Sequence, residues 1–452
     1  MSATARSLAI EILTEGEQTR EPIDRIRDTW LTRHPLPDPR DIGLVNAMIQ
    51  GVLRQQGYLD WLINRFARHP LNKMKPRTRQ ALRLGVFQLL FLHRIPAAAA
   101  INETVNGLKV SRQPRWLIDF VNGVLRSINR ARATLLAPDS SELPDPARLN
   151  HPTWLLDRWQ ARYGASALEE ICRLNNTPPA LVLRVQTNRI SCPDFQTLLA
   201  SHNIKARPGG LAPDSLVLDN GPPVPEIPGY DEGLFVVQDQ GAQLIGMLMS
   251  PLADSPYLDG CAGLGGKTGE LAARLPTGGK VIAVEPHLAR VALLRANLAK
   301  IGLLDRVDIY QMTLEDYARD TKLSFRGILL DVPCSGLGVI RRHPEIRWTR
   351  HADDLPGYQT KQLALLTSAA PLLMPGGVLV YATCSSEPEE NEEVIRLFLA
   401  SHPDFTLTPC APLLPESALP FVTEAGFLQT TPNLSGMDGF FAARLAKSTL
   451  NA

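Results

Sequence analysis

Two cysteines of this chain lie in short motifs whose side chains could perform covalent chemistry. Cys334 is the fourth residue of an Asp-Val-Pro-Cys-Ser motif that begins at Asp331, and Cys384 is the centre of a Thr-Cys-Ser motif. The first motif begins at the last residue of an apolar, strand-like segment at 327–331. The second begins at the last residue of another such segment, at 378–383. Because the carboxyl ends of parallel strands meet at one edge of a sheet, we expect Asp331 and both thiols to face the same site.

A pair of thiols beside an acid suits methylation of carbon-5 of a pyrimidine. That carbon is a poor nucleophile, but a thiolate that adds to carbon-6 converts the ring into an enamine, which can attack a sulfonium methyl group. An acidic group on the base edge stabilises the adduct, a base removes the carbon-5 proton, and the thiol is eliminated. Amine methyltransferases carry an aromatic residue at the position of Cys334, so the pattern favours carbon over nitrogen as the acceptor.

The residues leave two candidates for the attacking thiol. The nucleophile of DNA cytosine-C5 enzymes follows a proline, as Cys334 does, whereas that of RNA cytosine-C5 enzymes lies in a Thr-Cys-Ser motif, as Cys384 does. This chain has both motifs, which is the RNA pattern. We interpret Cys172, Cys192 and Cys410 as small apolar residues, the common role of a lone cysteine.

A glycine-rich turn lies between a predicted strand at 257–259 and a helix that ends at Leu275. It reads Cys-Ala-Gly-Leu-Gly-Gly-Lys-Thr from Cys261 to Thr268. A P-loop would need glycine at Cys261, and a dinucleotide fingerprint would need glycine at Thr268. The third interpretation is an S-adenosylmethionine loop. Glu285 ends the next strand, where a carboxylate can accept both hydroxyls of a ribose, so the turn and Glu285 together favour a nucleoside cofactor.

These motifs lie in a region of alternating strands and helices that begins near residue 230. The alternation predicts a parallel, doubly wound sheet, which a terminal pair of strands at 426–431 and 439–445 could close. The predicted strands are 257–259, 281–285, 307–310, 327–331 and 378–383, and the predicted helices lie at 288–301, 358–373 and 389–399.

The residues before this region predict two further parts. Residues 1–135 carry apolar residues at helical spacing with almost no strand signal, which indicates a helical bundle. Its clearest helices are predicted at 42–62, 78–93, 99–110 and 120–128. A Pro- and Ser-rich stretch at 137–149 is typical of a linker, and residues 150–230 mix short helices and strands as a small α+β module would.

Composition excludes several classes of protein. The 452 residues are 44% hydrophobic and 21% charged, and no apolar run approaches the roughly 18 residues of a membrane span. The amino-terminal segment lacks a signal-peptide core, so we expect a cytoplasmic protein. Six cysteines without a Cys-x-x-Cys pair predict neither a disulfide framework nor a metal site.

The net charge of +1 conceals an asymmetry along the chain. Residues 1–140 contain 21 Lys and Arg against 12 Asp and Glu, a net charge of +9, whereas the remainder carries −8. A basic first third indicates a module that binds a polyanion, although a solvated helical surface would give the same count.

Two basic runs are candidates for RNA contact. The run from Arg341 to Trp348 suits phosphate contact and base stacking, with a solvated loop around a packed Trp348 as the alternative. A run from Lys73 to Arg79 suits positioning of the phosphate backbone. The target base must leave its stack to reach Cys384. The predicted RNA contacts are Arg341, Arg342, Arg347, Trp348, Lys73, Lys75, Arg77 and Arg79.

On these motifs the chain resembles the RNA cytosine-C5 methyltransferases, and within them the bacterial enzymes that modify small-subunit ribosomal RNA. The segments Ala99–Val105 and Phe120–Arg126 resemble the NusB-type RNA-binding fold. The resemblance covers nearly the whole chain. It implies a NusB-like all-α RNA-binding domain at 1–136, a linker at 137–149, a small RRM-like α+β RNA-binding module at 150–230 and a Rossmann-like α/β methyltransferase domain at 231–447.

The resemblance also implies roles for the motif residues. Cys384 would be the nucleophile, Cys334 would assist loss of the carbon-5 proton and release of product, and Asp331 would hold the cytosine edge. The residues implied in binding S-adenosylmethionine are Cys261, Ala262, Gly263, Leu264, Gly265, Gly266, Lys267, Glu285 and Asp331.

Two positions depart from the family pattern. Leu264 replaces a proline of the turn, and Met312 occupies a position where the family usually has an acidic residue near the adenine. The backbone or Glu315 would then make the adenine contact.

The expected function is transfer of a methyl group from S-adenosylmethionine to carbon-5 of a cytosine in small-subunit ribosomal RNA, by a monomer without a metal. One alternative is a non-catalytic RNA-binding or antitermination factor, against which the intact set of Cys384, Cys334, Asp331 and Glu285 argues. Others are a methyltransferase for a different RNA, such as tRNA, and an amine or protein methyltransferase.

Overall fold

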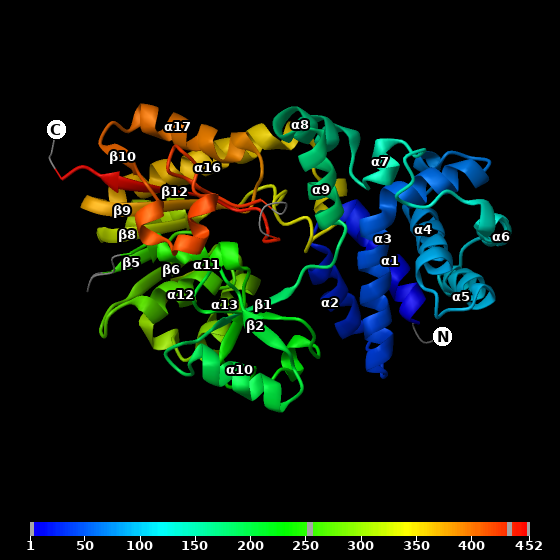
Figure 1. Ribbon diagram of the computed structural model, residues 1–452, viewed down its shortest axis with the longest axis horizontal. Helices are drawn as coiled ribbons and strands as arrows, with labels where there is room; N and C mark the ends of the chain where they lie inside the picture. The colour runs from blue at the N-terminus through cyan, green and yellow to red at the C-terminus, as the bar shows by residue number, and fades with distance from the viewer. Residues whose placement is uncertain (1–3, 251–255, 432–435, 450–452) are drawn as a thin grey trace. The chain divides into compact units, whose positions relative to one another are not determined.

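A computed structural model describes residues 4–250, 256–431 and 436–449, which form two compact units (Figure 1). The first unit is the chain up to Pro178 together with Ile340–Ala352, and the second is Pro179–Val339 with the chain from Asp353 onward. Within the described ranges, no helix combines the length and the apolar character needed to span a bilayer.

The first unit is helical, as predicted. Helices α1, α3, α4, α5 and α6 bury one continuous core, in which Leu8, Val52, Leu82 and Leu125 are almost fully buried. Helix α2 was not predicted because only Ile23 and Ile26 of its residues are buried. The helices are α1 (Ala5–Thr19), α2 (Ile23–Arg33), α3 (Pro39–Phe66), α4 (Pro76–Phe91), α5 (Ala97–Val110), α6 (Arg115–Ala131), α7 (Asp145–Arg148), α8 (Thr153–Tyr163), α9 (Ala165–Asn175) and, from the later segment, α15 (Ile346–Thr349).

The segment at 137–149, which is predicted to be a linker, is anchored on the helical bundle. Leu143 and Ala147 are buried in the helical core, and α7 forms within the segment. Its Pro and Ser content is typical of a linker, and its two buried apolar side chains fix the segment on the bundle. Helices α8 and α9 also group with the first unit, so the residues of the predicted module at 150–230 are divided between the two units.

The second unit begins with a small antiparallel sheet of order β2-β3-β1-β4. Phe195 and Leu199 of α10 (Cys192–Ser201) pack against Leu183 and Phe235 of this sheet. Strands β2 and β4 were not predicted because they are short and mostly not buried, so they lack a continuous buried apolar pattern. The strands are β1 (Leu181–Val185), β2 (Ala206–Pro208), β3 (Ser215–Leu218) and β4 (Phe235–Val237).

The main sheet has eight strands in the order β10-β12-β9-β8-β5-β6-β7, with β11 paired to β12. Strands β9, β8, β5, β6 and β7 are parallel, and β12 runs antiparallel to both β9 and β10. The sheet is therefore doubly wound, as predicted, and its terminal strands close one edge. The strands are β5 (Tyr257–Asp259), β6 (Val281–Val284), β7 (Val307–Tyr310), β8 (Phe325–Asp331), β9 (Leu373–Thr383), β10 (Phe405–Thr408), β11 (Leu428–Gln429) and β12 (Phe441–Lys447).

Alternate residues of the buried strands pack into two hydrophobic cores, one on each face of this sheet. Val281 and Ala283 of β6 point to one core, and Ile282 and Val284 point to the other. Figure 1 shows α12 and α13 on one face and α16 and α17 on the opposite face. The helices are α11 (Gln240–Met247), α12 (Gly266–Arg274), α13 (Leu288–Lys300), α14 (Leu314–Asp320), α16 (Leu355–Ala369) and α17 (Glu392–Ser401).

The chain reverses its direction across the sheet between β5 and β8. From β5 it proceeds to β6 and β7, and it then crosses back to β8 and β9 on the other side. Ligands of doubly wound sheets bind beyond the carboxyl ends of the strands at such a switch point. The sequence motifs follow these strand ends.

Candidate active site

The turn between β5 and α12 depends on two left-handed glycines. Gly263 has φ 54° and Gly265 has φ 87°, values that favour glycine. A Cβ on Gly265 would lie 2.5 Å from Cδ1 of Leu294, whereas a Cβ on Gly263 would meet nothing closer than 3.9 Å. The turn therefore packs closely on the helix side and leaves open space above Gly263.

Asp259, at the end of β5, holds the turn from below. Its carboxylate accepts hydrogen bonds from the backbone N–H of Cys261 at 3.2 Å and from Oγ1 of Thr268 at 2.7 Å. Burial raises the pKa of Asp259 to about 6, an effect that the Thr268 bond opposes and the charge of Asp331 reinforces. Sequence reasoning missed this residue.

The raised pKa of Asp259 predicts a pH-dependent cost to stability. Because the pKa rises from its ordinary value of 3.8 to about 6 on folding, the neutral acid is favoured in the folded state. The resulting stabilisation is complete below pH 3.8 and is lost as pH rises through 6. Between pH 4 and 7 the free energy of unfolding of Asp259→Asn should therefore gain about 2 kcal/mol relative to the parent protein.

Chemical denaturation of the two proteins at a series of pH values measures this difference. The comparison cancels the titration of every other group that the two proteins share. A difference that stayed constant from pH 4 to 7 would contradict a buried Asp259 carboxyl group with a raised pKa.

Glu285, directly after β6, lies against the same turn. It is 3% exposed, and its two oxygens accept hydrogen bonds from the backbone N–H of Gly263 at 3.1 Å and of His287 at 2.9 Å. Each carboxylate oxygen keeps a further lone pair. The side chain is thus fixed beside Gly263 and still has acceptor capacity.

The surroundings of the turn are strongly acidic. Burial raises the pKa of Cys261 well above its usual value, and the charges of Asp259, Asp331, Glu285 and Glu315 add to this effect. These carboxylates make the Cys261 thiol unreactive as a nucleophile, since attack requires the thiolate. They also disfavour a triphosphate and suit a ligand that carries positive charge.

Lys267 is the basic group of the turn and pairs with Asp331. Its Nζ lies 2.7 Å from Oδ2 of Asp331 at the end of β8. Although burial opposes the charged form, the Asp331 carboxylate raises the pKa of Lys267 above its usual value. Met312 packs partly buried against the core of the sheet, and no cluster of side chains suited to a metal ion occurs among the residues described.

The two motif cysteines are in contact. Sγ of Cys334 lies 3.0 Å from Sγ of Cys384, and the backbone N–H of Cys384 donates to Sγ of Cys334 at 3.3 Å. Both cysteines are free thiols. The hydrogen bond with Cys384 and burial raise the pKa of Cys334 well above its usual value. Cys334 is therefore held as the neutral thiol, and it can donate to the sulfur of Cys384.

A buried carboxylate, which sequence reasoning missed, ties the two cysteine motifs together. Oε2 of Glu390 accepts hydrogen bonds from Oγ of Ser335 and Oγ of Ser385, each at 2.5 Å. Its Oε1 accepts from the backbone N–H of Ser335 at 2.7 Å and from Nε2 of Gln362 at 3.0 Å. Burial raises the pKa of Glu390. The serine after each cysteine is thus bound to one side chain, which fixes the thiols at contact.

Glu390 was missed because it belongs to the acidic stretch Glu387-Pro-Glu-Glu-Asn391. Such a stretch is typical of a helix amino terminus, and a helix is predicted to begin there, at residue 389. The signal that could have pointed to it is the repetition of Cys-Ser at 334–335 and 384–385, since two buried hydroxyls each require a hydrogen-bond partner.

The prediction that Arg347 contacts RNA is wrong. This side chain is fully buried in the first unit, where its guanidinium donates to the backbone oxygens of Asn150 at 3.0 Å and Asn175 at 2.9 Å. It also donates to Oδ1 of Asn176 at 2.5 Å. Burial, with the charge of Arg54 adding to it, lowers the pKa of Arg347 to about 9. Arg347 is a structural residue that anchors the segment at 340–352.

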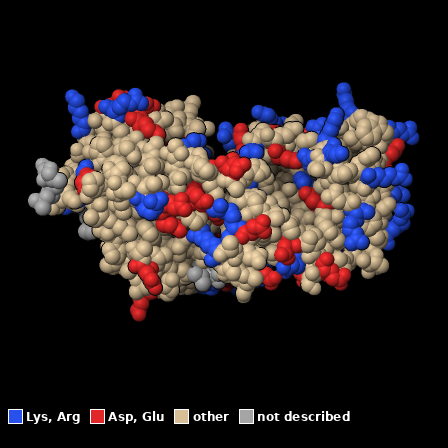
Figure 2. Space-filling view, turned by 90° about the horizontal axis from the view of Figure 1, so that it is seen from above, with Lys and Arg blue, Asp and Glu red and all other residues tan. Residues whose placement is uncertain are grey.

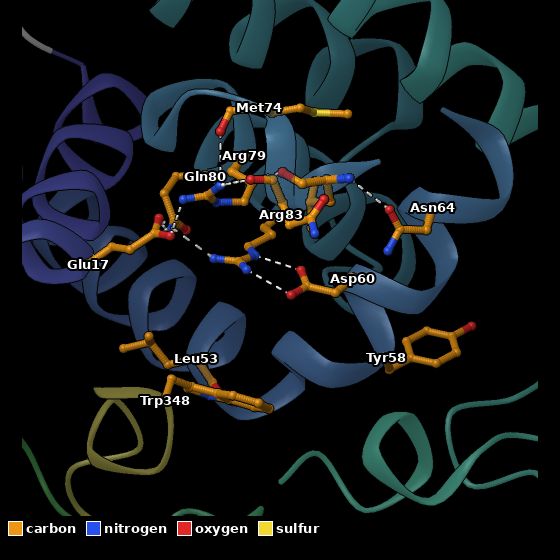
Figure 3. A network of polar contacts seen from close by, with 12 residues as sticks. Glu17, Leu53, Tyr58, Asp60, Asn64, Met74, Arg79, Gln80, Arg83 and Trp348 are labelled. Carbon is orange, nitrogen blue, oxygen red and sulfur yellow. Dashed lines mark hydrogen bonds and ion pairs between the residues drawn. The ribbon is translucent and has the colours of Figure 1, made fainter. Parts of the chain in front are cut away.

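Trp348 is likewise a packing residue, as the alternative interpretation held. Its ring packs partly buried against the helical core, and its Nε1 donates to the backbone oxygen of Leu53 at 2.7 Å (Figure 3). Arg341 and Arg342 are half-buried, and Nη2 of Arg341 donates to the backbone oxygen of Pro178 at 3.1 Å. RNA contact by these two arginines remains a prediction.

Much of the charge of the second basic run is neutralised within the first unit. Arg77 pairs with Glu11 at 2.5 Å, and Arg79 pairs with Glu17. Figure 3 shows Arg79 directed at Glu17, while Arg83 makes two bonds to Asp60, at 2.6 and 2.7 Å. Lys73 and Lys75 are exposed, so RNA contact by this run remains a prediction mainly for these two lysines.

Family models match most of the chain in three successive regions. A model for the NusB family matches residues 3–130, a ferredoxin-like domain of RsmF/B-like methyltransferases matches 151–225, and a model for 16S rRNA methyltransferase RsmB/F matches 246–446. Their order confirms the predicted fold class of a NusB-like bundle, a small α+β module and a Rossmann-like methyltransferase domain.

Individual proteins match over nearly the full length. A protein of Bacillus subtilis named probable ribosomal RNA small subunit methyltransferase B is 34% identical, over 98% of this chain and 99% of its own. One of Citrobacter koseri named ribosomal RNA small subunit methyltransferase B is 36% identical, over 90% of this chain and 91% of its own. The solved structure of PH0851 is 25% identical and covers 99% of this chain and 100% of that chain, with a TM-score of 0.83.

Proposed function

Because this chain belongs to the RsmB/F family of 16S rRNA methyltransferases, we propose that it transfers a methyl group from S-adenosylmethionine to carbon-5 of a cytosine in small-subunit ribosomal RNA. The observation that supports carbon-5 as the methyl acceptor is the 3.0 Å contact between the thiols of Cys334 and Cys384. Two thiols at neighbouring strand ends serve covalent activation of a pyrimidine, and amine methylation uses neither.

The residues at the turn fit S-adenosylmethionine, which supplies an electrophilic methyl group on a sulfonium. The open space above Gly263 admits a ligand, and the surrounding carboxylates favour a cofactor with positively charged sulfonium and ammonium groups. Gly263 and Gly265 would let the backbone approach the methionyl end, and the free lone pairs of Glu285 would accept the ribose hydroxyls. Glu315 would serve the adenine in place of an acid at Met312.

Glu285→Ala should weaken binding of S-adenosylmethionine about 10- to 100-fold, since charge-assisted hydrogen bonds contribute about 1.5–3 kcal/mol. Glu285→Gln keeps an acceptor oxygen, so its affinity for S-adenosylmethionine should lie between those of the parent protein and Glu285→Ala. Titration calorimetry measures the affinities, and Asp308→Ala, which removes an exposed carboxylate of β7, is the matched control. Unchanged affinity for Glu285→Ala would rule out the ribose contact.

Cys384 acts as the nucleophile in this proposal. Its sulfur forms a bond to carbon-6 of the flipped cytosine, the electron pair of the carbon-5–carbon-6 bond moves to carbon-5, and carbon-5 takes the methyl group. The raised pKa of Cys334 keeps that residue a thiol, so its S–H can stabilise the thiolate of Cys384 before attack.

Release requires two further events at the same ring. Carbon-5 loses its proton to water, the electron pair of that bond restores the double bond to carbon-6, and the sulfur of Cys384 leaves with the electron pair of the carbon–sulfur bond. Cys334 lies 3.0 Å from that sulfur and can donate to it as it leaves. General acid assistance of this kind typically contributes about 10²- to 10⁴-fold in rate.

Asp331 is placed to hold the edge of the base. Its Oδ2 is bonded to Lys267, and the side chain is 33% exposed at the carboxyl end of β8, ahead of Cys334. A carboxyl group there can bond to the Watson–Crick edge of cytosine and stabilise the charge of the adduct. The Lys267 ammonium fixes its orientation.

Incubation with S-adenosylmethionine and small-subunit ribosomal RNA, either deproteinised or assembled in the subunit, tests the function. Mass spectrometry of the nucleosides should show 5-methylcytidine with the parent protein and none with Cys384→Ala. N4-methylcytidine would contradict carbon-5 as the acceptor. The absence of any methylated nucleoside with either substrate would favour the non-catalytic RNA-binding alternative.

A further inference from the structure

The positive charge of the first unit is concentrated at a place that the sequence did not single out. The run from Lys73 to Arg83 is largely balanced by Glu11, Glu17 and Asp60. Between 109 and 132, by contrast, there are six basic residues and one acidic residue, Asp119. The six are Lys109, Arg112, Arg115, Arg126, Arg130 and Arg132, and all are exposed.

The partners of these basic residues leave their charge available. Among the described residues, the ion pair recorded for this group joins Arg115 to Asp119 at 3.9 Å, with both side chains largely exposed. Arg126 donates to Oδ1 of Asn122, and Arg130 donates to Oγ of Ser127, so neither guanidinium is neutralised by these bonds. Figure 2 shows Lys and Arg gathered at the end of this unit that carries α5 and α6.

The exposed residues of α6 form one continuous face. Trp116, Asp119, Gly123, Arg126 and Arg130 are all exposed and follow each other at intervals of three or four, so they lie on one side of the helix. The buried side consists of Leu117, Val121, Val124, Leu125 and Ile128. This exposed stripe, from Trp116 to Arg130, is about 21 Å long.

An aromatic ring stands at one end of the stripe. Trp116 is 70% exposed, more than any other large apolar side chain described. A tryptophan on a basic surface can stack on an unpaired base while the neighbouring arginines contact phosphates. The stripe therefore combines the two elements of RNA binding, whereas Arg347 and Trp348 of the segment at 341–348 serve packing.

Gly123, in the middle of the stripe, leaves room for a ligand at the surface of the helix. Its conformation is helical, and a Cβ at this position would meet nothing within 4 Å, so neither φ nor packing requires glycine. Glycine inside a helix is destabilising relative to alanine, and it leaves the helix backbone open to close approach by another molecule. The absent side chain lets a phosphate backbone lie against the helix between Trp116 and Arg126.

We propose that the stripe from Trp116 to Arg130, with Lys109, Arg112 and Arg132 beside it, binds single-stranded RNA. Arg126 and Arg130 neutralise phosphates, the backbone passes over Gly123, and an unpaired base stacks on Trp116. This surface belongs to the first unit, whereas the cysteines belong to the second. The proposal rests on the proposed function in one respect, because the RNA is taken to be the methylation substrate.

Nitrocellulose-filter binding of the full chain to a small-subunit ribosomal RNA transcript, over a range of salt, tests the surface. Arg126→Ala/Arg130→Ala should make the slope of log affinity against log salt shallower by about 1.4, the value for two phosphate contacts to a single strand. Trp116→Ala should weaken binding roughly 5- to 150-fold. Arg33→Ala/Arg68→Ala removes two exposed charges elsewhere in the first unit and should leave the slope unchanged.

Gly123→Ala separates binding from folding, because its two effects have opposite directions. The melting temperature should stay the same or rise, while RNA binding should weaken several-fold. If all the α6 variants kept the RNA affinity and salt slope of the parent protein, the proposal would be overturned. Binding of a protein partner would then be the remaining role for this face. An equal change of slope in the Arg33/Arg68 control would also overturn it, since the slope would then depend on the total charge of the protein and not on this surface.

The test distinguishes failure of this surface from failure of the proposed function. A parent protein that forms 5-methylcytidine while the α6 variants bind RNA normally contradicts only the surface. A parent protein that forms no methylated nucleoside while the α6 variants lose RNA affinity supports the surface and contradicts the proposed function.

Discussion

Cys334→Ala should accumulate a covalent protein–RNA adduct with ordinary substrate, whereas Cys384→Ala should form no adduct and no methylated product. Without Cys384 there is no sulfur to add to carbon-6. Without Cys334, addition and methyl transfer proceed, but the departing sulfur loses the S–H donor 3.0 Å away, and elimination becomes the slow step. Turnover of Cys334→Ala should fall about 10²- to 10⁴-fold.

Denaturing gels with labelled RNA measure the adduct. Cys410→Ala and Cys172→Ala are matched controls, since both change a buried cysteine outside the site and should behave as the parent protein. An adduct from Cys384→Ala, with none from Cys334→Ala, would exchange the two roles and indicate the mechanism of the DNA enzymes.

Glu390→Ala should lower kcat about 100-fold or more while the affinity for S-adenosylmethionine is retained. The substitution leaves the hydroxyls of Ser335 and Ser385 without their buried acceptor, so the two thiols lose their contact. A displacement of about 1 Å can cost about 100-fold in rate. Cofactor binding is spared because Asp259 and Glu285, and not Glu390, hold the turn.

Single-turnover kinetics and calorimetry separate these two effects. Glu390→Gln retains one acceptor oxygen and should recover part of the rate, which a general loss of stability would not explain. Glu416→Ala removes an exposed carboxylate and is the control. A folded Glu390→Ala protein with the parent kcat would show that Glu390 does not position the cysteines.

Most of the fold could be predicted because its elements have strong patterns. Val281–Val284 is entirely apolar and buried between two helical layers, and the buried apolar residues of α3 repeat at helical spacing from Val45 to Ile63. The segment at 137–149 shows what composition leaves open. Its Pro and Ser residues are typical of a linker, but they do not show that Leu143 and Ala147 pack in the helical core.

The site could be predicted only where a motif carries its chemistry. The glycines of the turn and the two cysteines have characteristic neighbours, so they were recognised. Asp259 and Glu390 have no such signal, because their role depends on donors that come together only in the folded chain, such as Thr268 and Ser335. The distribution of charge was mispredicted for the same reason, since sequence does not show that Arg347 is buried or that Arg79 meets Glu17.

The most direct test of covalent catalysis is to identify the residue that bonds to the substrate. RNA containing 5-fluorocytosine blocks loss of the carbon-5 substituent, so the adduct persists and can be digested and sequenced by mass spectrometry. We predict that the modified nucleotide is found on the peptide that contains Cys384. A nucleotide on Cys334, or the absence of any adduct from a protein that still methylates ordinary RNA, would contradict the proposed mechanism.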